Sequence, residues 1–151
     1  MPTVFHASVF QRSVIVWIGL STLAVANGVF REAFIAPRLG AQGGHVLSTL
    51  ILCFAIFAVT WFTLPWIEPR RGREALLVGA LWLALTLAFE FLAGHYLFGH
   101  PWEKLLADYD IARGRVWPLV LVTTLLAPWI TAVMRGMKGG GEREKRKKDE
   151  G

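Results

Sequence analysis

The sequence predicts an all-α membrane protein: four transmembrane helices arranged as two antiparallel hairpins, plus one short interfacial helix. Hydrophobic residues make up 54% of the 151 residues and aromatic residues 13%. The mean hydropathy is +0.47, which is unusual for a water-soluble domain. Four segments each provide the roughly 20 mostly apolar residues that a helix needs to cross a bilayer. A water-soluble four-helix bundle would need polar faces at helical spacing, which these segments lack.

The predicted spans cover residues 14–36, 45–66, 75–98 and 116–134. The segments PRLGAQGG and IEPRRGRE separate the first three. Because these links are short and contain Pro or Gly, consecutive helices are expected to return antiparallel. Residues 1–13 form an N-terminal segment. The glycine-led, mixed-charge tail over residues 135–151 is predicted to be disordered.

The third link, HPWEKLLADYD, predicts a short helix over residues 101–109. Its Trp102, Leu105, Leu106 and Tyr109 share one face, because they follow helical spacing. A short helix with a Trp and a Tyr on its apolar face is typical of the membrane surface. Two interpretations stay open for this helix, a simple interfacial anchor and a roof over whatever lies beneath it.

The distribution of Lys and Arg predicts the orientation in the membrane, because cytoplasmic flanks carry the excess. Of 16 such residues, five flank the ends reached after spans one and three: Arg31, Arg38, Lys104, Arg113 and Arg115. The other eleven (16 − 5) flank the opposite ends, so both termini are predicted to be cytoplasmic. The basic tail is then expected to contact anionic lipid, and nucleic acid is not an expected partner.

Neither a metal nor a cofactor is predicted. The one cysteine, Cys53, lies in the middle of the second span and is expected to be a packing residue. His95 and His100 are five positions apart and so point in different directions on a helix. The HxxxH and HExxH spacings of zinc sites are absent from the sequence.

The strongest indication of function is the stretch FEFLAGHYLFGH, where Glu90 interrupts an apolar run. Glu90 comes roughly 22 Å along span three from its cytoplasmic end, at about 1.5 Å per residue. A lone carboxylate at that depth is costly, so we expect it to face the bundle interior and to have a partner. Arg31, near the same end of span one, is a geometrically reasonable partner.

Other polar side chains gather at the same level. The candidate binding residues are Asn27, Arg31, Glu32, His45, Glu90, His95, Arg113 and Arg115. Because the inner half of each span is bare of ionisable groups, these residues predict an outward-facing polar cup and argue against a continuous pore. The arginines are suited to a phosphate or carboxylate head group.

Three functions stay open for this cup. The first is a non-catalytic accessory role, binding a lipid head group or another membrane protein, in a chain that is monomeric or homo-oligomeric. The second is an enzyme acting on a lipid or isoprenoid-phosphate head group, with Glu90 and His95 as catalytic acid and base. The third is a proton-coupled transporter that titrates Glu90. The same polar groups are also typical of purely structural bonds between membrane helices.

The runs FEFLAGHYLFGHPWEKLLADYDIARGRVW and ANGVFREAFIAPRLG resemble small four-span bacterial inner-membrane proteins of unassigned function. The resemblance covers residues 14–134. It implies location in a bacterial inner membrane and assigns neither a reaction nor a functional residue.

Overall fold

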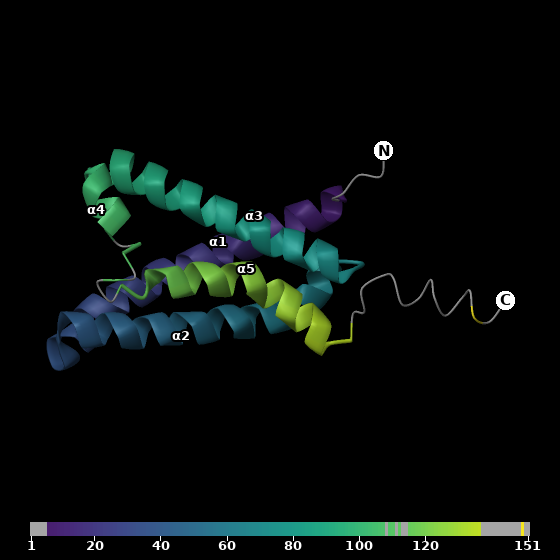
Figure 1. Cartoon of the computed structure of the whole chain (residues 1–151), viewed down its shortest axis with the longest axis horizontal. Coiled ribbons are helices and arrows are strands. Elements are labelled where there is room, and N and C mark those ends of the chain that lie inside the picture. The colour runs from purple at the N-terminus through teal and green to yellow at the C-terminus, as the bar shows by residue number, and fades with distance from the viewer. Residues whose placement is uncertain (1–5, 108, 111, 113–114, 137–148, 150–151) are drawn as a thin grey trace.

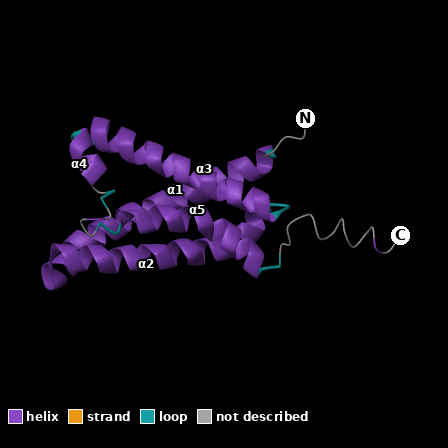
Figure 2. Ribbon diagram, in the orientation of Figure 1, coloured by secondary structure: helices purple, strands orange, loops and turns teal. Residues whose placement is uncertain are grey.

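The computed structural model describes residues 6–107, 109–110, 112, 115–136 and 149. These residues form helices joined by short links, with no strand among them (Figures 1 and 2). The all-α prediction is therefore confirmed. Within this described part of the chain, three helical stretches are long and apolar enough to cross a membrane, namely Ala7–Ile67, Gly72–Leu97 and Trp117–Met134.

The first stretch turns back on itself at Gly40. It comprises α1 (Ala7–Phe30), a π-helical turn η1 (Arg31–Ile35) and α2 (Ala36–Ile67). Gly40 has φ 77° and ψ 166°, a backbone conformation that is open essentially to glycine alone. Beyond it the chain reverses, so α1 and α2 lie side by side in opposite directions (Figure 1).

The link PRLGAQGG is thus helical on both sides of a single break, where the sequence predicted a separate loop. Pro37 does not interrupt the helical stretch and follows directly on the π-helical turn η1, in the first turn of α2. Helix α1 also begins earlier than the predicted first span, at Ala7.

The rest of the bundle comprises α3 (Gly72–Leu92), a second π-helical turn η2 (Ala93–Leu97), α4 (Trp102–Ala107) and α5 (Trp117–Met134). Helix α4 folds back against η2, and α5 packs against both α2 and α3 (Figure 1). We call the end that holds Gly40 and α4 the Gly40 end. The opposite end, where α2 gives way to α3 around Glu68, is the Glu68 end.

Helices α1 and α3 run in the same direction. The indole Nε1 of Trp82 donates to the carbonyl oxygen of Ser13 at 2.9 Å, and the indole Nε1 of Trp17 donates to Oγ1 of Thr86 at 3.1 Å. Both bonds join residues 69 positions apart. The second bond lies one helical turn further along both helices, with the same sequence separation, so the two helices must be parallel. Two consecutive hairpins would produce this arrangement.

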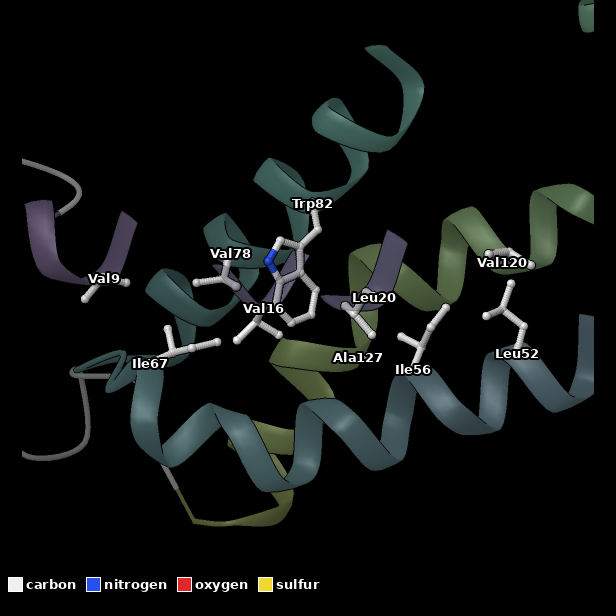
Figure 3. Packing of buried hydrophobic residues seen from close by; sticks show 10 residues of the cluster. All are labelled: Val9, Val16, Leu20, Leu52, Ile56, Ile67, Val78, Trp82, Val120 and Ala127. Atoms are coloured by element: carbon white, nitrogen blue, oxygen red, sulfur yellow. The ribbon is translucent and has the colours of Figure 1, made fainter. Parts of the chain in front are cut away.

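Trp82 is at the centre of the core. Its side chain is fully buried and lies among Val16 of α1, Val78 of α3 and Ala127 of α5 (Figure 3). Of the largest fully buried side chains, all but Ser48 lie in the half of the bundle nearer the Glu68 end: Trp82, Leu64, Ile67, Val78, Thr60, Thr131, Pro128 and Ser13. The packing is therefore densest in that half.

Large apolar side chains cover the outside of the bundle. Phe54 is 77% exposed, Phe62 78% and Val29 65%. Soluble monomers rarely expose contiguous apolar surface on this scale. This exterior suits helices surrounded by lipid and supports the prediction of a membrane protein.

Two arginines hold carbonyl groups at the Glu68 end. Arg12 pairs with Glu68 at 2.7 Å and donates to the carbonyl oxygen of Trp66 at 2.7 Å. Arg135 donates to the carbonyl oxygen of Trp61 at 2.6 Å, with its guanidinium 4.4 Å from the centre of the Trp61 ring. Pro65, four residues after Trp61, has no N–H for that carbonyl, so Arg135 replaces the missing helical donor.

Candidate functional site

A cavity of about 730 Å³ lies at the Gly40 end of the bundle. Its walls come from η1, the start of α2, the end of α3, η2, α4 and the start of α5. The lining combines charged, aromatic and apolar side chains: Arg31, Glu32, Ala36, Ala41, Gln42, His45, Val46, Phe89, Glu90, Phe91, Ala93, Gly94, Phe98, Leu105, Tyr109, Arg115 and Trp117. Both π-helical turns contribute to it, and such turns frequently accompany functional sites.

Glu90 is held by donors from two other segments. The hydroxyl of Tyr109 donates to its Oε2, and so does the indole Nε1 of Trp117, at 3.1 Å. Tyr109 follows α4 and Trp117 begins α5, so one partly buried carboxylate ties the short helix to the bundle. Two hydrogen bonds to the same carboxylate oxygen fix the position of the Glu90 side chain.

Arg31, on the η1 wall, contacts a carboxylate and an imidazole. Its Nε and Nη2 donate to Oε1 of Glu32 at 3.1 and 2.9 Å, and its Nη1 lies 3.0 Å from Nδ1 of His45. A guanidinium has only donors, so Nδ1 of His45 must be the acceptor and the ring must carry its proton on Nε2. The side chain of Arg31 is 27% exposed and that of Glu32 70%, so Arg31 is the more buried partner of this ion pair.

Helix α4 roofs the cavity on the α3 side. The ring of Phe91 stacks with those of Trp102 and Tyr109, at centroid distances of 6.2 and 5.8 Å. Leu105 packs directly on Gly94, where a Cβ would lie 2.7 Å from its Cδ2. Leu105 and Tyr109 line the space below. Helix α4 thus contributes Leu105 to the cavity wall, while its Trp102 and Leu106 are exposed, as they would also be in an interfacial anchor.

His95 belongs to this roof and not to the cavity lining. Its ring stacks on Trp102, 4.1 Å between centroids, and its Nδ1 lies 3.0 Å from the carbonyl oxygen of His100, to which it must donate. The sequence analysis counted His95 among the binding residues of the cup and, for an enzyme, as a catalytic group. In the structure it positions α4 instead.

Comparison with protein-family models, curated proteins and solved structures gives no match. Among the described residues, no group of three or more His, Cys, Asp or Glu side chains could hold a metal ion.

The structure brings five of the predicted site residues to one cavity: Arg31, Glu32, His45, Glu90 and Arg115. Asn27 lies outside its lining and donates to the carbonyl oxygen of Ser48 at 3.1 Å, which is a bond between α1 and α2. Arg113 lies outside the described residues.

The ion pair expected between Arg31 and Glu90 is replaced by other contacts. Arg31 pairs with its neighbour Glu32, and Glu90 accepts from Tyr109 and Trp117. The sequence placed Tyr109 on the apolar face of the short helix but did not identify it as a partner of Glu90, and it did not single out Trp117. Their signal was an aromatic ring with a polar edge at the same membrane depth as a lone carboxylate.

Proposed function

We propose that this protein crosses a bacterial inner membrane four times and binds the phosphate-bearing head group of an amphiphile in the cavity at its Gly40 end. The role is non-catalytic: the protein acts as a small lipid-binding component of the membrane. The Glu68 end faces the cytoplasm and the cavity opens towards the outer leaflet.

The topology rests on three features of the bundle. Gly40 divides the stretch Ala7–Ile67 into two antiparallel helices, so the three apolar stretches supply four spans. Helices α1 and α3 are parallel, as alternating spans require. Arg12, Arg70 and Arg135 flank the Glu68 end, and further Lys and Arg residues follow Arg135 in the sequence, so the positive-inside rule assigns this end to the cytoplasm.

The observation that carries the binding proposal is the placement of Arg31 and Arg115 in one cavity with a mostly apolar wall. They come from separate segments, η1 and the link before α5. Guanidinium groups bind phosphate oxygens through paired hydrogen bonds and are preferred for this purpose over lysine. Because Nε and Nη2 of Arg31 already donate to Glu32, a phosphate bound there would displace that exposed carboxylate, while Glu90 would keep its bonds to Tyr109 and Trp117.

The balance of charges suits a zwitterionic head group. The described residues that line the cavity include two arginines and two glutamates, and the formal charges of these four side chains cancel when both carboxylates are ionised. With a phosphate at the arginines, an ammonium group of the same head group would lie beside Glu90 and the rings of Phe91, Tyr109 and Trp117, because carboxylates and aromatic faces both attract cations. Phosphoethanolamine is a head group of this kind.

Native mass spectrometry of the protein in lipid nanodiscs tests the proposal. We expect wild type to retain phosphatidylethanolamine in preference to uncharged diacylglycerol, and Arg31→Gln and Arg115→Gln to lose that preference. Arg38→Gln is the matched control, because Arg38 contacts the carbonyl oxygen of Phe34 and does not line the cavity. Equal retention in all four proteins would refute a head-group site.

A further inference from the structure

A second pocket, of about 190 Å³, lies between the four long helices. Its wall includes Leu20 and Ala24 of α1, Leu52 and Ile56 of α2, and Val120 of α5. Because all four long helices contribute, it is a recess in the bundle rather than a dent on one helix pair.

The two pockets share one boundary. Phe89, Glu90 and Trp117 line both of them. Since Glu90 accepts from Trp117 at 3.1 Å, this boundary is fixed on one side by a hydrogen bond. A ligand that fills the cavity therefore lies beside the second pocket.

The lining of the second pocket is mostly apolar. Two of its three hydroxyl side chains are engaged with the protein. Oγ1 of Thr86 accepts from Trp17, and Oγ1 of Thr124 donates to the carbonyl oxygen of Val120 at 2.8 Å. The third is Ser21. Apolar cavities of about 150 Å³ stay dry and accept small apolar molecules, so a pocket of this size suits part of a hydrocarbon chain.

The pocket is reached from the side of the bundle. Helices α1 and α3 are joined by hydrogen bonds at Ser13 and Trp17, and then diverge towards the Gly40 end (Figure 1). Val25 of α1 and Phe89 of α3 line the pocket beyond that point and are 55% and 42% exposed. A chain lying in the membrane could therefore enter between α1 and α3.

We propose that the two pockets form one site, in which the cavity holds the phosphate-bearing head group and the second pocket holds the first part of one hydrocarbon chain of the same amphiphile. This inference rests on the proposed head-group function. Glu90, at the boundary, lies beside the linkage between head and chain. A second chain, where present, stays in the bilayer.

The test reads the position of the chain and not its affinity, because a chain gains little free energy on moving from lipid into an equally apolar pocket. An alkyl phosphate with a diazirine on its chain is added to the protein in phosphatidylcholine nanodiscs. The sample is illuminated, and the labelled residues are mapped by mass spectrometry. We expect wild type to be labelled mainly on Leu20, Ala24, Val25, Leu52 and Val120. Excess inorganic phosphate, which competes only for the cavity, should reduce this label, whereas label scattered over the outer faces should persist.

Ala24→Phe fills the second pocket and should remove the label from its wall. Ala26→Phe is the matched control: Ala26 is exposed on the same helix and does not line the pocket, so wild-type labelling is expected. Should Ala24→Phe fail to fold, Ala24→Val narrows the pocket less and should reduce the label in part. A labelling pattern that Ala24→Phe and Ala24→Val leave unchanged would overturn the inference.

The two proposals fail differently. If Arg31→Gln and Arg115→Gln leave retention of the head group unchanged, head-group binding is wrong, whatever the chain does. If those variants lose retention while the diazirine labels only outward-facing residues, the head-group site stands and the chain pocket is wrong.

Discussion

Replacing Gly79 with alanine should separate α3 from α5. A Cβ at Gly79 would lie 1.9 Å from the carbonyl oxygen of Leu125 and 2.8 Å from its carbonyl carbon. Carbon and carbonyl oxygen approach normally to about 3.3 Å, so the two backbones would have to move apart by roughly 1.4 Å. The obstacle is backbone and not the end of a flexible side chain, so no rotamer change relieves it.

The expected loss of stability follows from two opposing terms. Overpacking a close-packed interface costs typically about 1–3 kcal/mol, and glycine lets membrane helices approach at such points. Alanine returns up to about 1 kcal/mol through its higher helix propensity. A clash of this depth should fall at the upper end of the first range, so we expect a net loss of about 2 kcal/mol.

Gly19→Ala is the matched control, because a Cβ at Gly19 in α1 meets no atom within 4 Å. It should be neutral or slightly stabilising. Unfolding of both variants in mixed micelles of increasing sodium dodecyl sulfate, followed by tryptophan fluorescence, gives the two free energies of unfolding. Equal values would mean that α3 and α5 are not in backbone contact at this point, and the packing described here would be refuted.

Two further predictions concern polar contacts. Tyr109→Phe removes one hydrogen-bond donor to Glu90, so it should lower the free energy of local unfolding of α4 by about 1–2 kcal/mol. Amide hydrogen exchange should then be faster in α4 and unchanged in α3. Unchanged exchange in α4 would contradict the hydrogen bond. Arg135→Met leaves the carbonyl group of Trp61 without its side-chain donor and should cost about 1 kcal/mol of global stability. Pro65→Ala returns a helical N–H to that carbonyl. The double variant Arg135→Met/Pro65→Ala should therefore lose less stability than the sum of the losses in the two single variants. Additive losses would contradict the explanation.

The sequence predicted the helices well because their signal is local. Apolar runs of sufficient length predict helices in lipid whatever their neighbours are, since the backbone must satisfy its own hydrogen bonds there. The break at Gly40 was harder to predict. PRLGAQGG contains several residues that can end a helix, and only the packing of α1 against α2 selects one of them.

The sequence predicted at which level along the spans the site residues lie. It did not predict which way their side chains point. Arg31, His45, Glu90 and Arg115 are placed at one level by counting residues along each span, and the structure puts all four around one cavity. Their partners depend on the rotation of each helix about its axis, which the sequence does not reveal where a helix is apolar on all sides. The π-helical turns add to this, because each shifts the helical register without a recognisable sequence signal.

The division of the bundle into two halves bears on the alternative that the polar groups are purely structural. The densest packing lies towards the Glu68 end, where Trp82 bonds Ser13 and Gly79 meets Leu125. The contacts of Arg31 and Glu90 lie at the other end, and they join η1, α4 and the first turn of α5 to the bundle rather than holding its core. A group needed only to align helices would be expected where the helices meet most closely. Placement around a cavity, away from that region, supports the proposed binding role, under which substitutions of the cavity residues should change binding while the bundle stays folded.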